Sequence, residues 1–318
     1  MISCAGQLIV NSKRESNLIL CIAVFLFSIL FPSLGTARDL ADIKHDGVLR
    51  HIGVSYANFV SEYKEGNQTI NSGLDVELIK GFAQYLGVKY QFVSATWGNA
   101  LGKLTGRNGK YIDNQVVYGL SQAIEGDVMA HGVTTLEWRK EIIDFSDDYF
   151  PSAVWLIARV ESDLTPIVPT GNVNQDIQVV KRLLKNREVL AMRQSCLDPD
   201  LYHLFQSKAK VVLPTKTLKL NEMVPAILND EAETTLLDLP DSLIALDKWP
   251  NKIKVIGPIS NDQTMAVGFR KNSPLLRQAF NEYLAKIKAD GSFFRLVNKH
   301  YPSVFYYYHD YFSNTSIN

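Results

Sequence analysis

Net charge is the first thing that the sequence lacks. Lys and Arg together number 33, Asp and Glu together number 33, and the formal net charge at pH 7 is therefore zero. A neutral chain has no long-range field that would gather a polyanion. We therefore exclude nucleic acid as a partner, and we expect any charged ligand to be recognised by local groups.

Cysteine is also scarce. The chain has three, Cys4, Cys21 and Cys196, and the first two lie in an N-terminal segment that we expect to be removed. Cys196 is then alone, so no disulfide framework is available. Stability has to come from a hydrophobic core, which 318 residues with 46% hydrophobic residues can build. These features fit an exported bacterial domain of ordinary size.

The motifs of metal, nucleotide and hydrolytic chemistry are missing as well. The histidines, at positions 45, 51, 131, 203, 300 and 309, are scattered, and neither H-E-x-x-H nor paired C-x-x-C occurs. There is no G-x-S-x-G segment, and glycines 102, 106 and 109 do not form a phosphate-binding loop. We therefore expect no metal, no cofactor and no catalytic residue, and we do not expect an enzyme.

The N-terminus resembles a secretory signal. Lys13 and Arg14 precede an uncharged run over residues 18–31, which Pro32 and the small residues up to Ala37 follow. The run is too short to span a bilayer comfortably. We predict that residues 1–37 are a signal cleaved after Ala37 and that the mature protein is periplasmic. An uncleaved membrane anchor is the alternative.

From Gly47 onward the pattern predicts alternating strands and helices. We expect strands over 48–56, 88–93 and 127–133, helices over 74–86, 97–104 and 116–126, a turn or hairpin over 61–73, and an inserted loop over 105–115. The helix over 74–86 has apolar residues at every fourth position and ends at Gly87. Such alternation predicts an α/β domain with parallel pairing.

After a proline-containing connection over 161–176, the alternation restarts. We expect strands over 188–194, 209–214, 233–239, 252–257 and 263–271, and helices near 177–186, from Pro199, over 220–230 and over 241–249. A long helical region over 274–301 should break at Gly291. The two α/β stretches are of similar size.

Three segments carry a family resemblance. They are "SGLDVELIKGFAQYLGVKYQFV" (72–93), "EGDVMAHGVTTLEWRKEIIDFSDDYF" (125–150) and "ETTLLDLPDSLIAL" (233–246). In order and spacing they resemble the periplasmic solute-binding proteins of family 3, the polar-amino-acid type, and the related binding-like half of F-type membrane-bound lytic transglycosylases. The resemblance covers roughly residues 48–303.

The resemblance implies a two-lobe periplasmic-binding fold of type II with two crossings between the lobes. Lobe 1 is expected to comprise residues 39–152 and 262–305, and lobe 2 residues 155–258. Residues 306–318 form an aromatic C-terminal tail. The segment "YPSVFYYYHDYF" (301–312) resembles the one that links the binding and catalytic halves of the transglycosylases, and it is also expected to pack back on a lobe.

The resemblance also implies a ligand site. Arg139 would hold a ligand carboxylate with its rigid donor fork, and Asp238 on the other lobe would pair with an ammonium. A zwitterion would then bridge the lobes, so that binding and closure become one event. The remaining expected ligand-binding residues are Thr134 through its hydroxyl, Gly132 through its backbone, Phe59 as an aromatic wall, and Ser195 and Cys196.

Some positions depart from the family pattern. Leu136 stands where a threonine is usual, Ser195-Cys196 replaces Gly-Thr, and His131 replaces a small residue. The changes at Leu136 and at Ser195-Cys196 put a simple L-amino acid in doubt as the ligand. His131 either points at the ligand or is a buried histidine whose hydrogen bonds are satisfied. Two structural alternatives stay open: a surface ion pair of Arg139 with Glu137 or Asp144, and a helix-capping role for Asp238.

The predicted function is binding of a small polar solute for delivery to a membrane permease or a sensor. The solute is expected to be zwitterionic, an amino acid or a related peptide or cell-wall fragment, and the protein to be a monomer. One alternative is a degenerate lobe pair used for signalling or as a scaffold. Another is a relative of the lytic transglycosylases, whose chemistry would need a catalytic glutamate in a separate helical domain.

Overall fold

The computed structural model describes residues 38–66, 68–113, 115–214 and 220–314. The predicted signal over residues 1–37, with Cys4 and Cys21, lies outside them. A compact unit begins at Asp39. Within the described ranges, no helix has both the length and the apolar character needed to cross a membrane.

The first sheet contains strands from both ends of this unit. Its order is β4-β1-β7-β16-β8, with β1 parallel to β4 and β7, and β16 antiparallel to β7 and β8. The strands are β1 Val48–Val54, β4 Lys89–Ala95, β7 Val128–Met129, β8 Ile143–Phe145 and β16 Gly268–Arg270. Its helices are α2 Leu40–Asp46, α3 Leu74–Leu86, α4 Ala100–Thr105, α5 Glu137–Lys140, α9 Pro274–Ala289 and α10 Ser292–His300.

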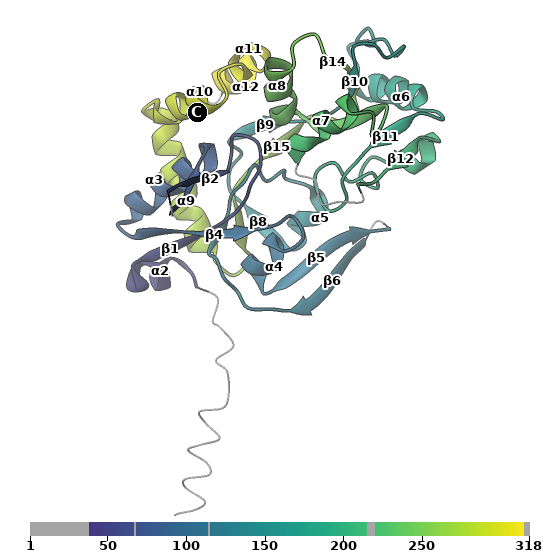
Figure 1. The fold of residues 1–318 in the computed structure, drawn as a ribbon. Helices are drawn as coiled ribbons and strands as arrows, with labels where there is room; N and C mark the ends of the chain where they lie inside the picture. The colour runs from purple at the N-terminus through teal and green to yellow at the C-terminus, as the bar shows by residue number, and fades with distance from the viewer. Residues whose placement is uncertain (1–37, 67, 114, 215–219, 315–318) are drawn as a thin grey trace, which may run out of the picture. The chain divides into compact units, whose positions relative to one another are not determined.

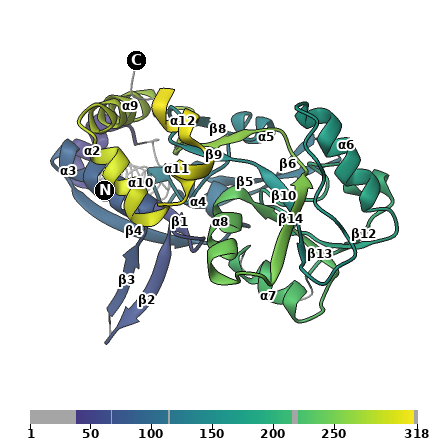
Figure 2. The same cartoon turned by 90° about the horizontal axis from the view of Figure 1, so that it is seen from above.

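The C-terminal helices pack on this first sheet. Figures 1 and 2 both show α3, α9 and α10 gathered on one side, where they contact one another. The predicted break between α9 and α10 is confirmed at Gly291, whose φ of 75° is left-handed. The predicted end of α3 is likewise confirmed at Gly87, where φ is 74° and the backbone N–H caps the helix.

The second sheet has the order β12-β11-β13-β10-β14. β11 is parallel to β12 and β13, and β10 is antiparallel to β13 and β14. The strands are β10 Val154–Arg159, β11 Glu188–Leu190, β12 Lys210–Val212, β13 Thr234–Asp238 and β14 Ile253–Pro258. Helices α6 Val173–Leu183, α7 Met223–Leu228 and α8 Leu239–Lys248, with the 3₁₀ turns η1 Leu204–Ser207 and η2 Leu220–Glu222, belong to this part of the chain.

Two segments cross between the sheets. β9 Phe150–Ser152 leads into β10 of the second sheet, and β15 Gln263–Met265 leads back into β16 of the first. β9 and β15 pair antiparallel, with Thr264 opposite Pro151, so the two crossings run side by side. Together with the two mixed sheets, they give the predicted two-lobe α/β fold of type II.

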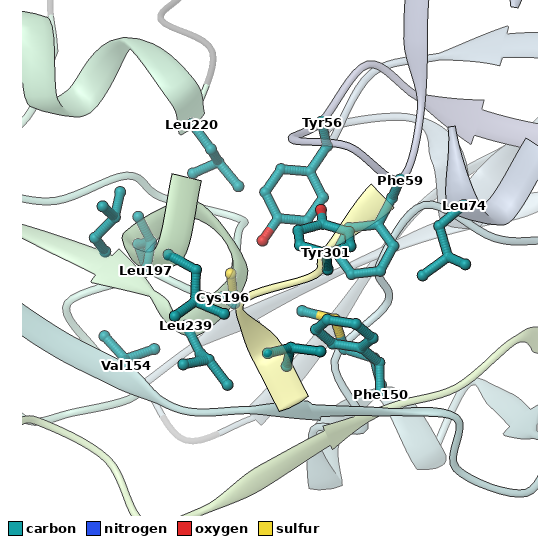
Figure 3. Close-up of a cluster of buried hydrophobic side chains, with 14 of the residues drawn as sticks. Tyr56, Phe59, Leu74, Phe150, Val154, Cys196, Leu197, Leu220, Leu239 and Tyr301 are labelled. Atoms are coloured by element: carbon teal, nitrogen blue, oxygen red, sulfur yellow. The ribbon is translucent and has the colours of Figure 1, made fainter. Parts of the chain in front are cut away.

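A hydrophobic cluster joins the two lobes. Figure 3 shows Tyr56, Phe59 and Phe150 facing Leu197 and Leu239, with Tyr301 among them. The ring of Phe59 lies 5.2 Å from that of Phe150 and 5.0 Å from that of Tyr301. The tail forms α11 Val304–Tyr307 and α12 His309–Asn314. Phe312 reaches the Phe150 ring at 6.2 Å, so the tail packs back on the fold.

The region over 105–126 corrects two predictions. The expected inserted loop and the expected helix over 116–126 are instead the two strands of one hairpin, β5 Arg107–Ile112 and β6 Gln115–Ser121. Val116, Val117 and Tyr118 favour a strand because β-branched and aromatic side chains suit an extended backbone. The earlier segment over 61–73 also forms a hairpin, β2 Ser61–Glu65 with β3 Gln68–Ser72, as predicted.

The predicted helix from Pro199 is also wrong. Residues 199–203 form turns, and only the short η1 follows. The Asp198 carboxylate accepts hydrogen bonds from the backbone N–H groups of Gln194, at 2.7 Å, and Asp200, at 3.1 Å. An aspartate that bonds to nearby backbone stabilises a turn in the same way as it caps a helix, so the sequence signal was ambiguous.

Candidate functional site

Arg139 is buried at the short helix α5. Only 4% of Arg139 is exposed to solvent. Its Nη1 donates a hydrogen bond to the Thr134 carbonyl at 2.9 Å, and its guanidinium lies 5.3 Å from the centre of the Trp138 ring. It forms no ion pair with a described carboxylate. The candidate surface partners are engaged elsewhere, Glu137 with Lys140 at 2.7 Å and Asp144 with Lys271 at 3.4 Å. The surface ion pair considered above is therefore not formed.

Polar atoms around Arg139 lack partners too. Thr134 Oγ1, His131 Nδ1 and Trp138 Nε1 are all buried and have no hydrogen-bond partner in the described structure. The pKa of His131 is lowered to about 3, first by burial and next by the positive charge of Arg139, so its ring is neutral. A group of unsatisfied donors and acceptors beside an unpaired guanidinium is the chemistry of a ligand site.

A small cavity lies against this group. Its lining includes Trp97, His131, Trp138 and Arg139 from the first lobe and Ser195 and Asp198 from the second. Asn108, Lys110 and Tyr111 of the β5–β6 hairpin also line it, so the insertion contributes a wall and a second cation. The cavity volume is about 20 Å³, which is room for about one water molecule. A solute could enter only if the lobes or these side chains moved.

Asp238 lies at the end of β13 and begins α8. It is 1% exposed, and its carboxylate accepts from the Tyr56 hydroxyl, from Cys196 Sγ at 3.3 Å and from the Asp241 backbone N–H at 3.2 Å. The Asp241 contact is a helix cap, so the capping role considered above is present. The Tyr56 contact joins the lobes, and Figure 3 shows the Tyr56 hydroxyl pointing toward Cys196.

The charges of Arg139 and Asp238 both act on Cys196. Burial raises the pKa of the Cys196 thiol most, Asp238 raises it further, and Arg139 lowers it. The pKa of Asp238 is itself raised by burial, against the hydrogen bonds from Tyr56 and Cys196. The thiol therefore lies within electrostatic reach of both the Arg139 cation and the Asp238 carboxyl group. Among the described residues, neither Cys196 nor Asp238 lines the cavity at Arg139.

Gly132 holds the loop that carries His131 and Thr134. Its φ is +66°, and a Cβ here would lie 2.6 Å from the Phe59 ring and 2.8 Å from the Tyr56 ring, so only glycine fits. Its backbone N–H donates to Asp75 at 2.6 Å, and the Tyr149 hydroxyl donates to the same carboxylate at 2.8 Å. The N–H predicted to contact the ligand is thus already used inside the protein.

The other predicted site residues are placed as follows. Ser195 lines the cavity, but its hydroxyl donates to the Met192 carbonyl at 2.8 Å. Phe59 was predicted as an aromatic wall and is instead 0% exposed inside the inter-lobe cluster, away from the cavity. Tyr56, three residues earlier, is the aromatic residue of this segment that reaches Asp238.

Sequence reasoning missed several residues of the site, among them the hairpin residues Asn108, Lys110 and Tyr111. Trp97 lines the cavity, with its ring 5.0 Å from His131 and 5.5 Å from Tyr56. Asp198 lines the opposite wall. A usable signal existed for the aromatic pair: Tyr56 and Trp97 each follow a strand of a parallel sheet, and the carboxyl ends of such strands are where α/β folds bind ligands.

Comparison with known proteins gives the family context. The family described as bacterial extracellular solute-binding proteins, family 3, matches residues 110–303. The membrane-bound lytic murein transglycosylase F of Desulfosudis oleivorans is 24% identical over 84% of this chain and 51% of its own length. The amino-acid-binding protein AabA of Dichelobacter nodosus is 24% identical over 73% of this chain and 80% of its own length. The chain thus spans about half the length of the transglycosylase relatives.

Solved structures share the fold. A mutant of ArgBP from T. maritima superposes with a TM-score of 0.63 at 22% identity, covering 83% of this chain and 99% of that one. The amino acid ABC transporter substrate-binding protein AbpA from Streptococcus pneumoniae, bound to L-arginine, gives 0.61 at 20% identity, covering 87% and 99%. At these identities the likeness establishes the two-lobe fold and nothing more specific.

Proposed function

Because the chain belongs to the bacterial extracellular solute-binding proteins of family 3, we propose that it binds a small zwitterionic solute between its lobes. The solute is an amino acid or a related peptide or cell-wall fragment. The protein works as a periplasmic monomer and delivers the solute to an ABC-type permease or a sensor. It performs no catalysis.

The observation that carries this proposal is the unpaired, buried guanidinium of Arg139. Burying a cation without a counter-ion is costly, by several kcal/mol in real proteins. A ligand carboxylate would offset that cost, because a charge-assisted hydrogen bond contributes about 1.5–3 kcal/mol where water is excluded. Lys110 lines the same cavity as Arg139, and Thr134 Oγ1 is buried without a partner; both would complete the anion site.

The positive end of the solute would be held by Asp238. In the present arrangement Tyr56 donates to that carboxylate and the cavity beside Arg139 holds about 20 Å³. An incoming ammonium would replace the Tyr56 hydroxyl, and the ring would move aside to enlarge the crevice. Solute binding therefore exchanges one contact between the lobes for another that passes through the ligand.

A second candidate function is a module that no longer binds a solute and serves in signalling or as a scaffold. One observation favours it: Tyr56 satisfies Asp238 from within the protein, as a ligand otherwise would. The match to the binding-like half of the transglycosylases is compatible with such a role next to another activity.

A thermal-shift screen separates the two candidates. The wild type, Arg139→Ala and the exposed control Lys140→Ala are tested against amino acids, small peptides and muropeptides. A ligand at one hundred times its Kd stabilises the native state by about 2.7 kcal/mol. We expect that shift in the wild type and in Lys140→Ala, and its loss in Arg139→Ala. Equal shifts in all three proteins would refute the role of Arg139, and no shift with any compound would favour the scaffold.

A further inference from the structure

A second, larger cavity lies between the lobes, on the far side of the Tyr56–Asp238 contact. Its volume is about 230 Å³. The first lobe contributes Ala57, Asn58 and Ser61, directly after Tyr56, and the second lobe contributes residues of η2, α7, β13 and α8. Within the described part of the chain, it shares no lining residue with the cavity at Arg139.

This cavity combines one buried acid with a wall of aliphatic and polar residues. Asp241 lines it, is 4% exposed, and has an Oδ2 atom without a hydrogen-bond partner in the described structure. Most of the remaining wall is aliphatic, with Val224, Leu237 and Ile244 among its residues. A buried carboxyl oxygen without a partner is costly to leave unsatisfied, so this atom points to a missing donor.

The lysine on the wall does not supply that donor. Lys248 also lines the cavity, but its Nζ lies 4.7 Å over the centre of the Trp249 ring, and the Asp241 Oδ2 atom has no hydrogen-bond partner in the described structure. A bare metal ion does not suit the space, because hard cations need several oxygen ligands at close range and Asp241 is the one carboxylate among the described lining residues. A cation with an apolar body fits both features.

We infer that this cavity is a second binding site, for a small primary amine whose ammonium group pairs with Asp241 and whose alkyl part contacts the aliphatic wall. The site is separate from the solute crevice of the proposed function. Since its walls come from both lobes, an occupant would hold the lobes together and favour the closed arrangement.

Binding of an ammonium group at this site should release a measurable proton from Asp241. Burial raises the pKa of the Asp241 carboxyl well above its ordinary value, and the neighbouring Asp238 raises it further. An ammonium that binds there would displace a proton. The other groups that face this carboxyl are Asp238, Tyr56, Cys196, Tyr301 and Lys248.

The test compares n-pentylammonium chloride with 1-pentanol, which has a similar shape but no charge, by isothermal titration calorimetry at pH 7. The wild type should bind the amine about tenfold or more tightly than the alcohol, with heats that differ between buffers of different protonation enthalpy. Asp241→Asn should lose that preference, and Lys248→Met should keep or increase it. Equal binding of the two compounds, or a preference that survives in Asp241→Asn, would overturn the inference.

Two further variants keep the outcome clear. Asn221→Trp places a large side chain at an exposed position of the cavity wall, so it should weaken both compounds without disturbing the core. Arg139→Met should leave amine binding unchanged even if it abolishes solute binding. Loss of amine binding in Arg139→Met would assign the amine to the solute crevice and refute a second site, whereas failure of the solute screen alone would leave the amine result standing.

Discussion

Two buried arginines in this fold should respond in opposite ways to the same substitution. Arg139 and Arg270 are both 4% exposed. Arg270 lies 3.5 Å from the Asp127 carboxylate and also donates to backbone carbonyls of the first lobe. Arg139 has only the Thr134 carbonyl and the face of Trp138. Substituting the two arginines therefore compares a buried cation that has a counter-ion, Arg270, with one that has no counter-ion among the described residues, Arg139.

The expected magnitudes follow from those contacts. Arg139→Met removes a desolvation cost of several kcal/mol. It loses a hydrogen bond to a buried carbonyl, at about 1–3 kcal/mol, and a cation–π contact of about 1 kcal/mol. The ligand-free variant should thus be as stable as the wild type or up to about 2 kcal/mol more stable. Arg270→Met removes the cation beside the buried Asp127 carboxylate and should lose about 3–5 kcal/mol.

Urea unfolding at pH 7, followed by circular dichroism, measures both free energies. The m-values should stay unchanged, so that a change in midpoint is a change in stability. If Arg139→Met loses more than about 2 kcal/mol without ligand, Arg139 is a structural residue with compensation that we have not identified. The reasoning that leads from its burial to a ligand carboxylate would then fail.

Three further predictions concern neighbouring residues. Tyr56→Phe should lower the stability of the ligand-free protein by about 1–3 kcal/mol, because it removes the hydroxyl donor of the buried Asp238 and leaves Cys196 Sγ and the Asp241 N–H. It should also tighten solute binding in calorimetry; weaker binding would contradict the exchange of Tyr56 for the solute ammonium. The pKa of Asp75 is raised to about 7 by burial, so its protonated form contributes stability that is full below pH 4 and lost as the pH rises through 7. Asp75→Asn should therefore gain stability relative to the wild type as the pH rises from 4 to 7, by at most about 4 kcal/mol, and a constant difference in urea unfolding over that range would refute the shift. Gly132→Ala should cost more than about 2 kcal/mol by thermal unfolding, whereas Gly171→Ala, with φ of +81° and open space around it, should cost about 1 kcal/mol; equal costs would rule out the clash.

Parts of the fold could be predicted because their local signals agree with their tertiary contacts. The helix over 74–86 has an apolar stripe and a glycine at its end, and the structure buries that stripe. The break at Gly291 needs a left-handed residue and has one. Segments whose role depends on distant contacts were harder. The hairpin over 107–121 is mostly exposed, so its pattern did not carry the alternation that marks a half-buried strand.

In the site, too, some residues could be predicted from local sequence patterns and others depend on tertiary contacts. Arg139 could be chosen because its spacing within a segment matched a known pattern, and the structure buries it without an ion pair to any described carboxylate. Phe59 and Tyr56 lie three residues apart after the same strand, and only the three-dimensional path of that turn decides which of them reaches Asp238. The sequence showed only that Asp241 lies in the first turn of a helix. The cavity beside its carboxyl group is formed in part by residues of the other lobe, which the sequence does not place there.

The most direct test is a crystal structure of the protein with the tightest-binding solute from the screen. We predict a solute carboxylate on the Arg139 guanidinium and the Thr134 hydroxyl, a solute ammonium on Asp238, and the Tyr56 hydroxyl displaced from that carboxylate. A complex in which the solute lies elsewhere, with Arg139 still bonded only to the Thr134 carbonyl and Tyr56 still on Asp238, would contradict the account.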